Sequence, residues 1–359
     1  MREPALRPTR SGSLYSVQVS TRFLSPLAKA LSLLGAVSVL ALSAPVQAAA
    51  ADAPAVFSIE SPKAVTSLLL DIAHAGKRLV AVGDRGHILF SDDAGRNWVQ
   101  ARVPSRQMLT GVFFIDDKKG WAVGHDAQIL ATVDGGANWT LQHEDLGREA
   151  PLLDIWFQDA NRGYAVGAYG ALLETSDGGK SWTDVSDRLD NEDGYHLNGI
   201  AAVKDAGLFV VGEQGSMFRS ADWGQTWERV SGPYEGSLFG ALGTASSNTL
   251  LVYGLRGNLF RSSDFGNTWQ ALQLRSDTGT LEFGLAGGSL LKDGSVVIVG
   301  HGGSVLTSSD SGRSFTVINR ADRASLAAVT EDAAGKLILV GQGGVLAADA
   351  NGAAPGQQQ

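Results

Sequence analysis

Six copies of a short motif, in which Ser or Thr is followed at fixed spacing by Asp, Gly and an aromatic residue, recur along the chain. The copies are Ser91-Asp93-Gly95-Trp98, Thr132-Asp134-Gly136-Trp139, Thr175-Asp177-Gly179-Trp182, Ser220-Asp222-Gly224-Trp227, Ser262-Asp264-Gly266-Trp269 and Ser308-Asp310-Gly312-Phe315. Successive aromatic residues are 41, 43, 45, 42 and 46 positions apart. One match would be chance, but six in phase predict a repeat architecture.

A second signal runs in phase with these Asp boxes and occurs once more often. Apolar, β-branched-rich runs end at Gly83, Gly124, Gly167, Gly212, Gly254, Gly300 and Gly341. Each is followed after two residues by another Gly, or by Ala127 in the second copy. Gly-x-x-Gly between two strand-like runs indicates a tight hairpin, because such turns need residues that tolerate positive φ. The sequence therefore contains seven units.

Each unit divides into four short strands. In the second unit we expect strands at 109–115, 121–123, 129–132 and 139–142, with the Asp box between the last two. Outside the N-terminus, no segment keeps an apolar 3.6-residue period with helix caps. Seven units of four strands predict an all-β, seven-bladed β-propeller over residues 49–350.

The last unit is incomplete, because no aromatic residue and no fourth strand follow Gly341. A strand-like run at 55–60 precedes the first unit. Since an unpaired sheet edge exposes backbone donors and acceptors, we expect this run to supply the outer strand of the last blade and to close the ring. Residues 351–359 are predicted to be a disordered tail.

The N-terminal fifty residues have the composition of an export signal. Basic residues precede an apolar stretch at 27–42, and small residues follow it at 45–50. We interpret residues 1–48 as a secretory signal peptide cut after Ala48, which leaves no stable transmembrane segment. The chain contains no Cys, so disulfides and thiolate sites are excluded. We expect an exported, monomeric protein, periplasmic or, in a photosynthetic host, in the thylakoid lumen.

Charge argues against a nucleic-acid partner. The whole chain has a formal net charge of −8, and removing the five basic residues and one acidic residue of positions 1–48 leaves −12. Nucleic-acid binding depends on neutralising phosphates with Lys and Arg. No cofactor motif or metal-ligand spacing is present, and the acidic run at 184–193 is expected to be a solvated connection.

The Asp boxes are predicted to be structural. Ser, Thr and Asp side chains in tight turns bond to nearby backbone N–H groups, and the aromatic residue covers the turn with apolar surface. Copies placed around a ring cannot converge on one active site. This interpretation covers Asp93, Trp98, Asp134, Trp139, Asp177, Trp182, Asp222, Trp227, Asp264, Trp269, Asp310 and Phe315.

The Gly turns and the connections between blades are expected on the face opposite the Asp boxes. The residues inside these turns vary from unit to unit. They form a candidate partner-binding rim, with a plain solvated turn surface as the alternative: Asp84, Arg85, His125, Asp126, Tyr169, Glu213, Gln214, Arg256 and His301. The connections add Arg106, Arg148, Glu149, Arg188, Arg229, Arg275, Arg320 and Arg323, and Arg suits bidentate carboxylate or peptide contacts.

Asp boxes combined with strand-Gly-x-x-Gly turns in one exported chain of seven units resemble the photosystem II stability/assembly factor family of BNR-repeat propellers. The resemblance covers approximately residues 55–350. It implies a noncatalytic, chaperone-like scaffold that binds a membrane-protein complex or its subunits, as photosynthetic members bind a newly made reaction-centre subunit. Family members also occur in bacteria that lack photosystem II, and this chain lacks the lipid-modified Cys of some cyanobacterial members.

Two alternatives stay open at the level of the sequence. One is a sialidase-like glycosidase, whose constellation would be Tyr169, Glu213, Asp84, Arg85 and Arg256, although the Arg-Ile-Pro motif typical of sialidases is absent. The other is a carbohydrate-binding module. Turnover of a glycoside would distinguish the enzyme from both binding proteins.

Overall fold

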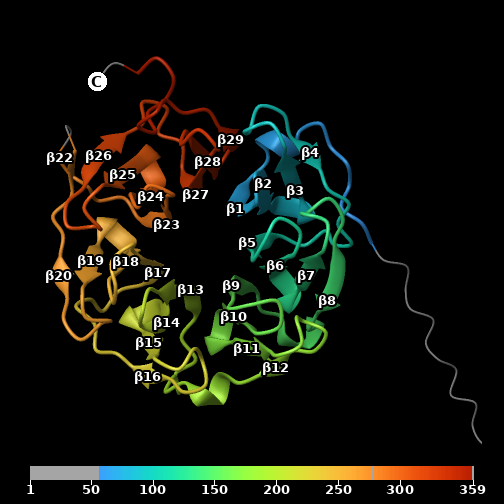
Figure 1. Cartoon of the computed structure of the whole chain (residues 1–359), viewed down its shortest axis with the longest axis horizontal. Coiled ribbons are helices and arrows are strands. Elements are labelled where there is room, and N and C mark those ends of the chain that lie inside the picture. The colour runs from blue at the N-terminus through green and yellow to red at the C-terminus, as the bar shows by residue number, and fades with distance from the viewer. Residues whose placement is uncertain (1–55, 277–278, 358–359) are drawn as a thin grey trace, which may run out of the picture. The chain divides into compact units, whose positions relative to one another are not determined.

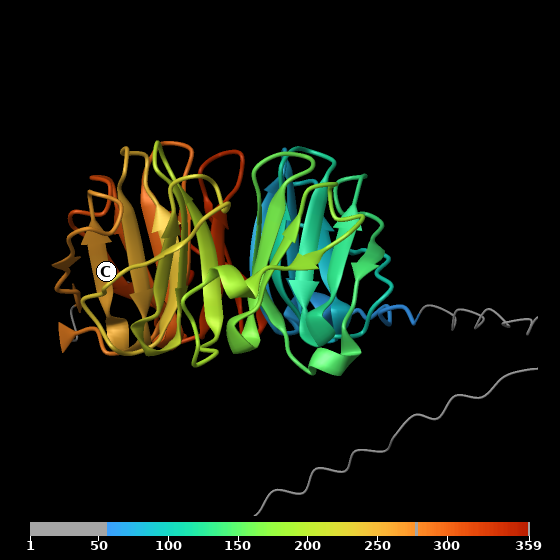
Figure 2. The same ribbon diagram turned by 90° about the horizontal axis from the view of Figure 1, so that it is seen from below.

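The repeat units fold into seven antiparallel sheets arranged as the blades of a ring (Figure 1). The computed structural model describes residues 56–276 and 279–357, and the predicted signal peptide at 1–48 lies outside them. Six blades have four strands and the last has three, so the predicted seven-bladed β-propeller is confirmed. Figure 2 shows the strands running side by side between the two faces of the ring.

The first three blades follow the chain in order. Their strands are β1 (Leu69–Ala75), β2 (Arg78–Gly83), β3 (Ile88–Ser91), β4 (Val99–Gln100), β5 (Leu109–Phe114), β6 (Gly120–Gly124), β7 (Ile129–Thr132), β8 (Thr140–His143), β9 (Leu152–Phe157), β10 (Gly163–Gly167), β11 (Leu172–Thr175) and β12 (Thr183–Asp184). The four strands expected in the second unit are thus found within a residue or two at their ends.

The remaining blades repeat the same order. Their strands are β13 (Leu197–Val203), β14 (Gly207–Gly212), β15 (Met217–Ser220), β16 (Glu228–Arg229), β17 (Leu238–Gly243), β18 (Leu250–Gly254), β19 (Leu259–Ser262), β20 (Gln270–Ala271), β23 (Leu285–Leu290), β24 (Val296–Gly300), β25 (Ser304–Ser308), β26 (Thr316–Asn319), β27 (Leu326–Glu331), β28 (Leu337–Gly341) and β29 (Gly344–Leu346). A separate hairpin, β21 (Arg275–Ser276) and β22 (Gly279–Thr280), lies between the fifth and sixth blades in sequence.

Short 3-10 turns account for all the helical structure of the described residues. They are η1 (Ala64–Thr66), η2 (Asp84–Gly86), η3 (His125–Ala127), η4 (Leu146–Arg148), η5 (Ala168–Gly170), η6 (Ser186–Arg188), η7 (Glu213–Gly215), η8 (Leu255–Gly257) and η9 (His301–Gly303). Six of them are the predicted Gly turns. In the described part of the chain, no helix is long and apolar enough to cross a membrane.

The core lies between neighbouring blades rather than inside any single sheet. One cluster joins Val80 and Ile88 of the first blade to Leu109 and Leu130 of the second, and similar clusters follow around the ring. The middle strands are buried on both faces, which explains their continuous apolar runs. Each blade is therefore stabilised by its two neighbours, and the ring has to close.

Closure does not use the predicted N-terminal strand, so that prediction is wrong. Residues 57–61 lie against the first blade: Ser58 donates its backbone N–H to Val103 (2.9 Å), and the Arg102 guanidinium covers the Phe57 ring. The seventh blade remains three-stranded. The ring closes by apolar packing instead, with Leu69 and Ile72 of β1 in one cluster with Val340 of β28.

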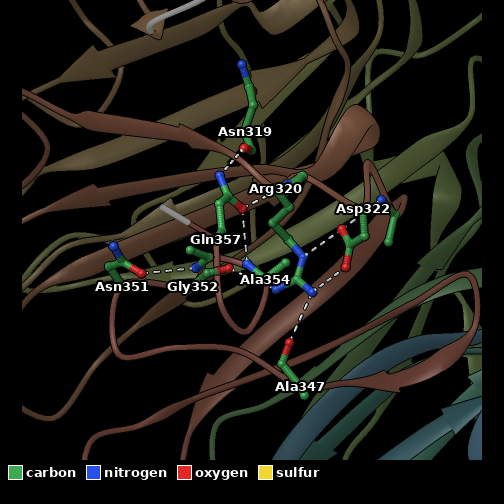
Figure 3. A network of polar contacts seen from close by, with 11 residues as sticks. Asn319, Arg320, Asp322, Ala347, Asn351, Gly352, Ala354 and Gln357 are labelled. Carbon is green, nitrogen blue, oxygen red and sulfur yellow. Dashed lines mark hydrogen bonds and ion pairs between the residues drawn. The ribbon is translucent and has the colours of Figure 1, made fainter. Parts of the chain in front are cut away.

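The C-terminal residues cover the seventh blade and are packed, unlike the predicted disordered tail. Ala353 and Ala354 are buried. The buried Arg320 guanidinium donates to the carbonyl oxygens of Gly352 (2.9 Å) and Ala347 (3.0 Å), and Gln357 bonds to the backbone on both sides of Arg320 (Figure 3). A polar composition suggested disorder, but one buried cation supplies the donors that this segment needs.

Candidate partner-binding face and central channel

The seven Gly turns share one backbone design. In each, the residue after the first Gly donates its N–H to a carbonyl at the start of the inner strand, as Asp84 does to Leu68 and Glu213 to His196. The second residue inside the turn has positive φ in all seven blades: Arg85, Asp126, Tyr169, Gln214, Arg256 and Gly302 at 51–66°, and Gly343 at 99°. The first Gly of each turn is nearly fully extended in the six 3-10 turns. The first Gly is therefore not needed for positive φ, which is the role that the sequence predicted for it.

That first Gly is required by a close approach of two backbones. A Cβ built at Gly83, Gly124, Gly167, Gly212, Gly254, Gly300 or Gly341 would overlap the carbonyl oxygen of the residue that precedes the inner strand. The middle strand and the start of the inner strand are therefore in backbone contact at this end of every blade. This contact fixes the Gly turns and the connections between blades on one face, as the topology predicted.

The nine candidate rim residues all lie on this face, in the turns of six blades. Arg85, His125, Tyr169, Gln214, Arg256 and His301 are exposed, whereas Asp84, Asp126 and Glu213 are half-buried. Their side chains are held on a rigid backbone, because each turn is bonded to the inner strand of its own blade. The face is thus a ring of accessible, unlike side chains around the centre of the propeller.

Some of these residues contact one another and others are kept apart by the ring. The Tyr169 ring meets the His196 ring edge to face, with centroids 5.0 Å apart, and the His196 backbone N–H donates to Glu213 Oε2 (3.2 Å). Asp84 and Arg85 form a local ion pair at 3.3 Å. The sialidase-like constellation is divided among the first, third, fourth and fifth blades, and no hydrogen bond or ion pair between described residues connects Arg256 to the rest.

Most Arg residues of the connections have partners within the protein; the buried Arg320 cannot serve in recognition, and for the others that role stays a prediction. Arg148 pairs with Asp184 (2.8 Å), Arg188 pairs with Glu174 (2.9 Å), Arg229 donates to the Asp190 carbonyl (3.0 Å), and Arg320 is buried. Sequence reasoning could not separate these groups, because their partners lie in other strands and connections that only the fold brings close. Arg256, Arg275 and Arg323 are exposed and form no ion pair with described residues.

A groove of about 410 Å³ opens beside the first Gly turn. It lies between η2 and the N-terminal segment, and Lys63, Arg85 and Arg106 line it together with Asp84 and Glu60. The Arg106 guanidinium also donates to the Phe57 carbonyl (2.8 Å), which holds the segment at the edge of the groove. The N-terminal segment thus adds one basic and one acidic side chain, Lys63 and Glu60, beside the rim.

The Asp boxes lie on the opposite face and form six copies of one network. In each box the Ser or Thr hydroxyl donates to Asp Oδ1 (2.7–2.9 Å) and accepts from the Gly backbone N–H (2.7–3.0 Å). Asp Oδ1 also accepts the backbone N–H of the residue four positions later, and Oδ2 accepts its side chain. Both carboxylate oxygens are therefore occupied within the turn.

The central channel carries two carboxylates that sequence reasoning missed. Asp71 of β1 and Asp154 of β9 line a cavity of about 540 Å³ formed by the inner strands. Asp71 Oδ2 accepts the N–H of Val112 in the second blade (2.8 Å), and Asp154 Oδ2 accepts that of Ile200 in the fourth (2.9 Å). The signal was present in the sequence, because Leu-Leu-Asp-Ile occurs twice, at 69–72 and 152–155.

Burial raises the pKa of both carboxyl groups, to about 7 for Asp71 and about 6 for Asp154. Hydrogen bonds from the backbone oppose this effect, and the proximity of Asp154 raises the pKa of Asp71 further. A raised folded-state pKa means that the folded protein binds more protons than the unfolded chain. The stability that this protonation contributes is fully present below about pH 4 and is lost as the pH rises through 6 and 7.

We therefore expect the double variant Asp71→Asn/Asp154→Asn to have a flatter stability curve than the wild type between pH 5 and 8. Urea unfolding at several pH values measures both curves. Burial lowers the pKa of His74, His87 and His143, which acts in the opposite direction, but these groups are common to both proteins and cancel in the difference. A difference between the two curves that does not change with pH would contradict the assignment.

Within the ranges 56–276 and 279–357, no group of three or more His, Cys, Asp or Glu residues is arranged to hold a metal ion. The two channel carboxylates are the charged groups of the channel lining, and the rim supplies mixed charges and one exposed aromatic ring. The fold and the two faces define a single-chain Asp-box propeller with a candidate binding rim.

The chain belongs to the photosynthesis system II assembly factor YCF48 family, whose model matches residues 95–150 and 141–282. It is similar in fold to the solved structure "YCF48 bound to D1 peptide", with a TM-score of 0.62 and 20% identity over 80% of this chain and 94% of that one. YCF48 from Cyanidioschyzon merolae gives a TM-score of 0.62 and 18% identity over 80% and 96% of the two chains. The WD40 propeller domain of Doa1 is also similar, with a TM-score of 0.59 and 13% identity over 81% of this chain and 94% of that one. Comparison with curated proteins gives no match.

Proposed function

We propose that this protein is a noncatalytic scaffold that binds a segment of a membrane-protein subunit on the face formed by the Gly turns. Family membership supports the class of function, and a related propeller is described as bound to a D1 peptide. The partner of this chain is a membrane-protein complex or one of its subunits, and the scaffold assists its assembly.

The observation that carries this proposal is that most Gly turns have a non-Gly residue at the position where the backbone is left-handed. Arg85, Asp126, Tyr169, Gln214 and Arg256 occupy a conformation that Gly adopts without strain, and the sixth and seventh blades do use Gly at this position, as Gly302 and Gly343. A non-Gly residue there costs about 1 kcal/mol, and such strain is typical of functional sites. Five blades out of seven thus keep a side chain at a position where folding alone favours Gly.

We also propose that the protein works outside the cytoplasm, in the periplasm or, in a photosynthetic host, in the thylakoid lumen. The support is the arrangement of basic, apolar and small residues at positions 1–50 and the absence of Cys from the chain. In this location the rim would meet the exported parts of a membrane-protein subunit.

Affinity capture from membrane extracts tests the proposal. The protein is expected to recover a membrane-protein subunit, and the variant Arg85→Glu/Arg256→Glu is expected to recover about tenfold less, because like charges at an interface weaken association strongly. The matched control is Arg96→Glu/Arg313→Glu, which reverses two exposed Arg residues of the Asp-box face.

Equal recovery by the wild type and both variants would contradict a role for the rim. Turnover of a fluorogenic glycoside that is lost in Tyr169→Phe or Glu213→Gln would contradict the noncatalytic part of the proposal. The two measurements are independent, so each part of the proposal can fail without the other.

A further inference from the structure

The central channel differs from the rim in the kind of ligand that it can accept. All seven inner strands have a β-bulge near the rim face, and the bulged residues line the channel: Leu70, Thr110, Leu153, Asn198, Phe239, Ala286 and Ala327. A bulge redirects side chains, and bulges are common beside functional sites. The cavity of about 540 Å³ is large enough for a small organic molecule or the end of a long side chain.

Asp71 and Asp154 occupy equivalent positions in two blades, directly after the bulged residue. The other five blades have no polar side chain at this position. The residues that correspond to Asp71 and Asp154 are Gly111, Gly199, Gly240, Gly287 and Ala328. The repeat therefore folds without a carboxylate at this position, and two blades carry one.

A buried hydroxyl group provides an observation independent of the carboxylates. Tyr253 of β18 is only 4% exposed, it lines the channel, and its ring lies over Gly240 with its hydroxyl beside Gly288. Its hydroxyl forms no hydrogen bond with the described residues. Burial raises the pKa of this hydroxyl, and the negative charges of Asp154 and Asp71 raise it further. The Tyr253 side chain is buried as a whole, but its hydroxyl oxygen stays accessible from the channel, where water or a ligand can accept or donate the hydrogen bond that the protein does not supply.

The lining contains no positive charge to balance the carboxylates. Among the described residues that surround the cavity, Asp71 and Asp154 are the only charged ones, and Phe113, Trp156, Phe239 and Tyr253 supply aromatic surface. Two carboxylates with aromatic walls favour a cation that carries apolar groups, since rings attract such cations when water is excluded. A bare metal ion fits less well, because each carboxylate already accepts two backbone N–H groups.

We propose that the channel is a binding site for an organic cation, a guanidinium or alkylammonium group held by Asp71, Asp154 and the Tyr253 hydroxyl. The group can belong to a free amine or to a cationic side chain of a bound polypeptide. The site does not depend on the proposed function of the rim, because a free amine would fill it without any partner.

Isothermal titration calorimetry of the full-chain protein at pH 8 tests this site with two probes. One is agmatine, and the other is a capped Ala-Arg-Ala tripeptide, with the capped citrulline tripeptide as its neutral analogue. The wild type is expected to bind agmatine, and Asp71→Asn/Asp154→Asn to bind it at least about tenfold more weakly, which corresponds to about 1.4 kcal/mol. Tyr253→Phe, which keeps the buried ring, is expected to weaken binding about threefold.

The matched control is Asp187→Asn/Asp190→Asn, which removes the same charge from exposed positions and should leave the affinity unchanged. Binding of both cationic probes assigns the site to a cationic group from either source, and binding of agmatine alone assigns it to free amines. Three results would overturn the proposal: no binding of either probe, equal affinity in the channel double variant, or binding of Ca²⁺ without binding of agmatine. Near-ultraviolet circular dichroism verifies that each variant is folded.

Discussion

Replacing Arg320 with Ala is expected to lower the free energy of unfolding by about 3 kcal/mol. The side chain is 1% exposed and forms four hydrogen bonds, two to the Asp322 carboxylate (2.7 and 3.1 Å) and two to the carbonyl oxygens of Gly352 and Ala347. Removing the guanidinium leaves these acceptors without a donor, and the cost of unpaired buried polar groups exceeds the gain from making the bonds. Urea unfolding measures the effect.

Two further variants separate the loss of the Arg320 hydrogen bonds from a general loss of positive charge. Arg323→Ala removes an exposed cation from the same connection and should change stability by less than about 0.5 kcal/mol. Arg320→Lys keeps the charge but not the planar fork, so it should be nearly as destabilising as the Ala variant. If Arg320→Ala and Arg323→Ala were equally stable, the contacts of Arg320 that Figure 3 shows would not stabilise the protein.

Gly212→Ala is expected to destabilise the protein by about 3 kcal/mol or to prevent folding. Its φ of −158° is accessible to any residue, so backbone conformation is not the cause. A Cβ at this position would overlap the His196 carbonyl oxygen, which also accepts the Glu213 N–H (3.0 Å). Since both groups belong to the backbone, no rotamer change relieves the overlap, and the two strands must separate.

The matched control for Gly212→Ala is Gly147→Ala. Gly147 is exposed, and the nearest atom to an added Cβ would be Asp145 Oδ1 at 3.4 Å, an ordinary contact. Its stability should stay within about 0.5 kcal/mol of the wild type. Thermal unfolding of both variants tests whether the first Gly of each turn is required by the close approach of two backbones. Equal melting temperatures of the two variants would contradict that explanation.

The period of the repeat was sufficient to predict the blades, because each unit is a local meander whose turns are encoded within it. The Asp boxes and the Gly turns appear on opposite faces for the same reason. Contacts between units were harder to predict. The sequence at 55–60 predicts a strand, but Ser58 bonds to Val103 of the first blade. The alternation of residues gives no information about which of two sheet edges a distant segment will join.

In the candidate site, too, features encoded within one unit were predictable and contacts between distant segments were not. Positions such as Tyr169 and Gln214 were predicted from the turns alone, and their exposure agrees with a surface role. Arg148, Arg188 and Arg320 cannot be distinguished from them in the sequence, because composition does not reveal the groups that the fold places beside each guanidinium. Asp71 and Asp154 lie in inner strands and not in turns, so a prediction based on turns does not include them. The signal in the sequence is an isolated Asp among Leu and Ile residues.

The central claim is that the face of the Gly turns binds a segment of a membrane-protein subunit. Site-specific photo-crosslinking tests it most directly, with benzoylphenylalanine at Gln214 in η7 or at Gln225 beside the fourth Asp box, both of which are exposed and lie on opposite faces of one blade. The account predicts crosslinks to a membrane-protein subunit from position 214 and none from position 225. Crosslinks from position 225 alone, or equally from both, would contradict it.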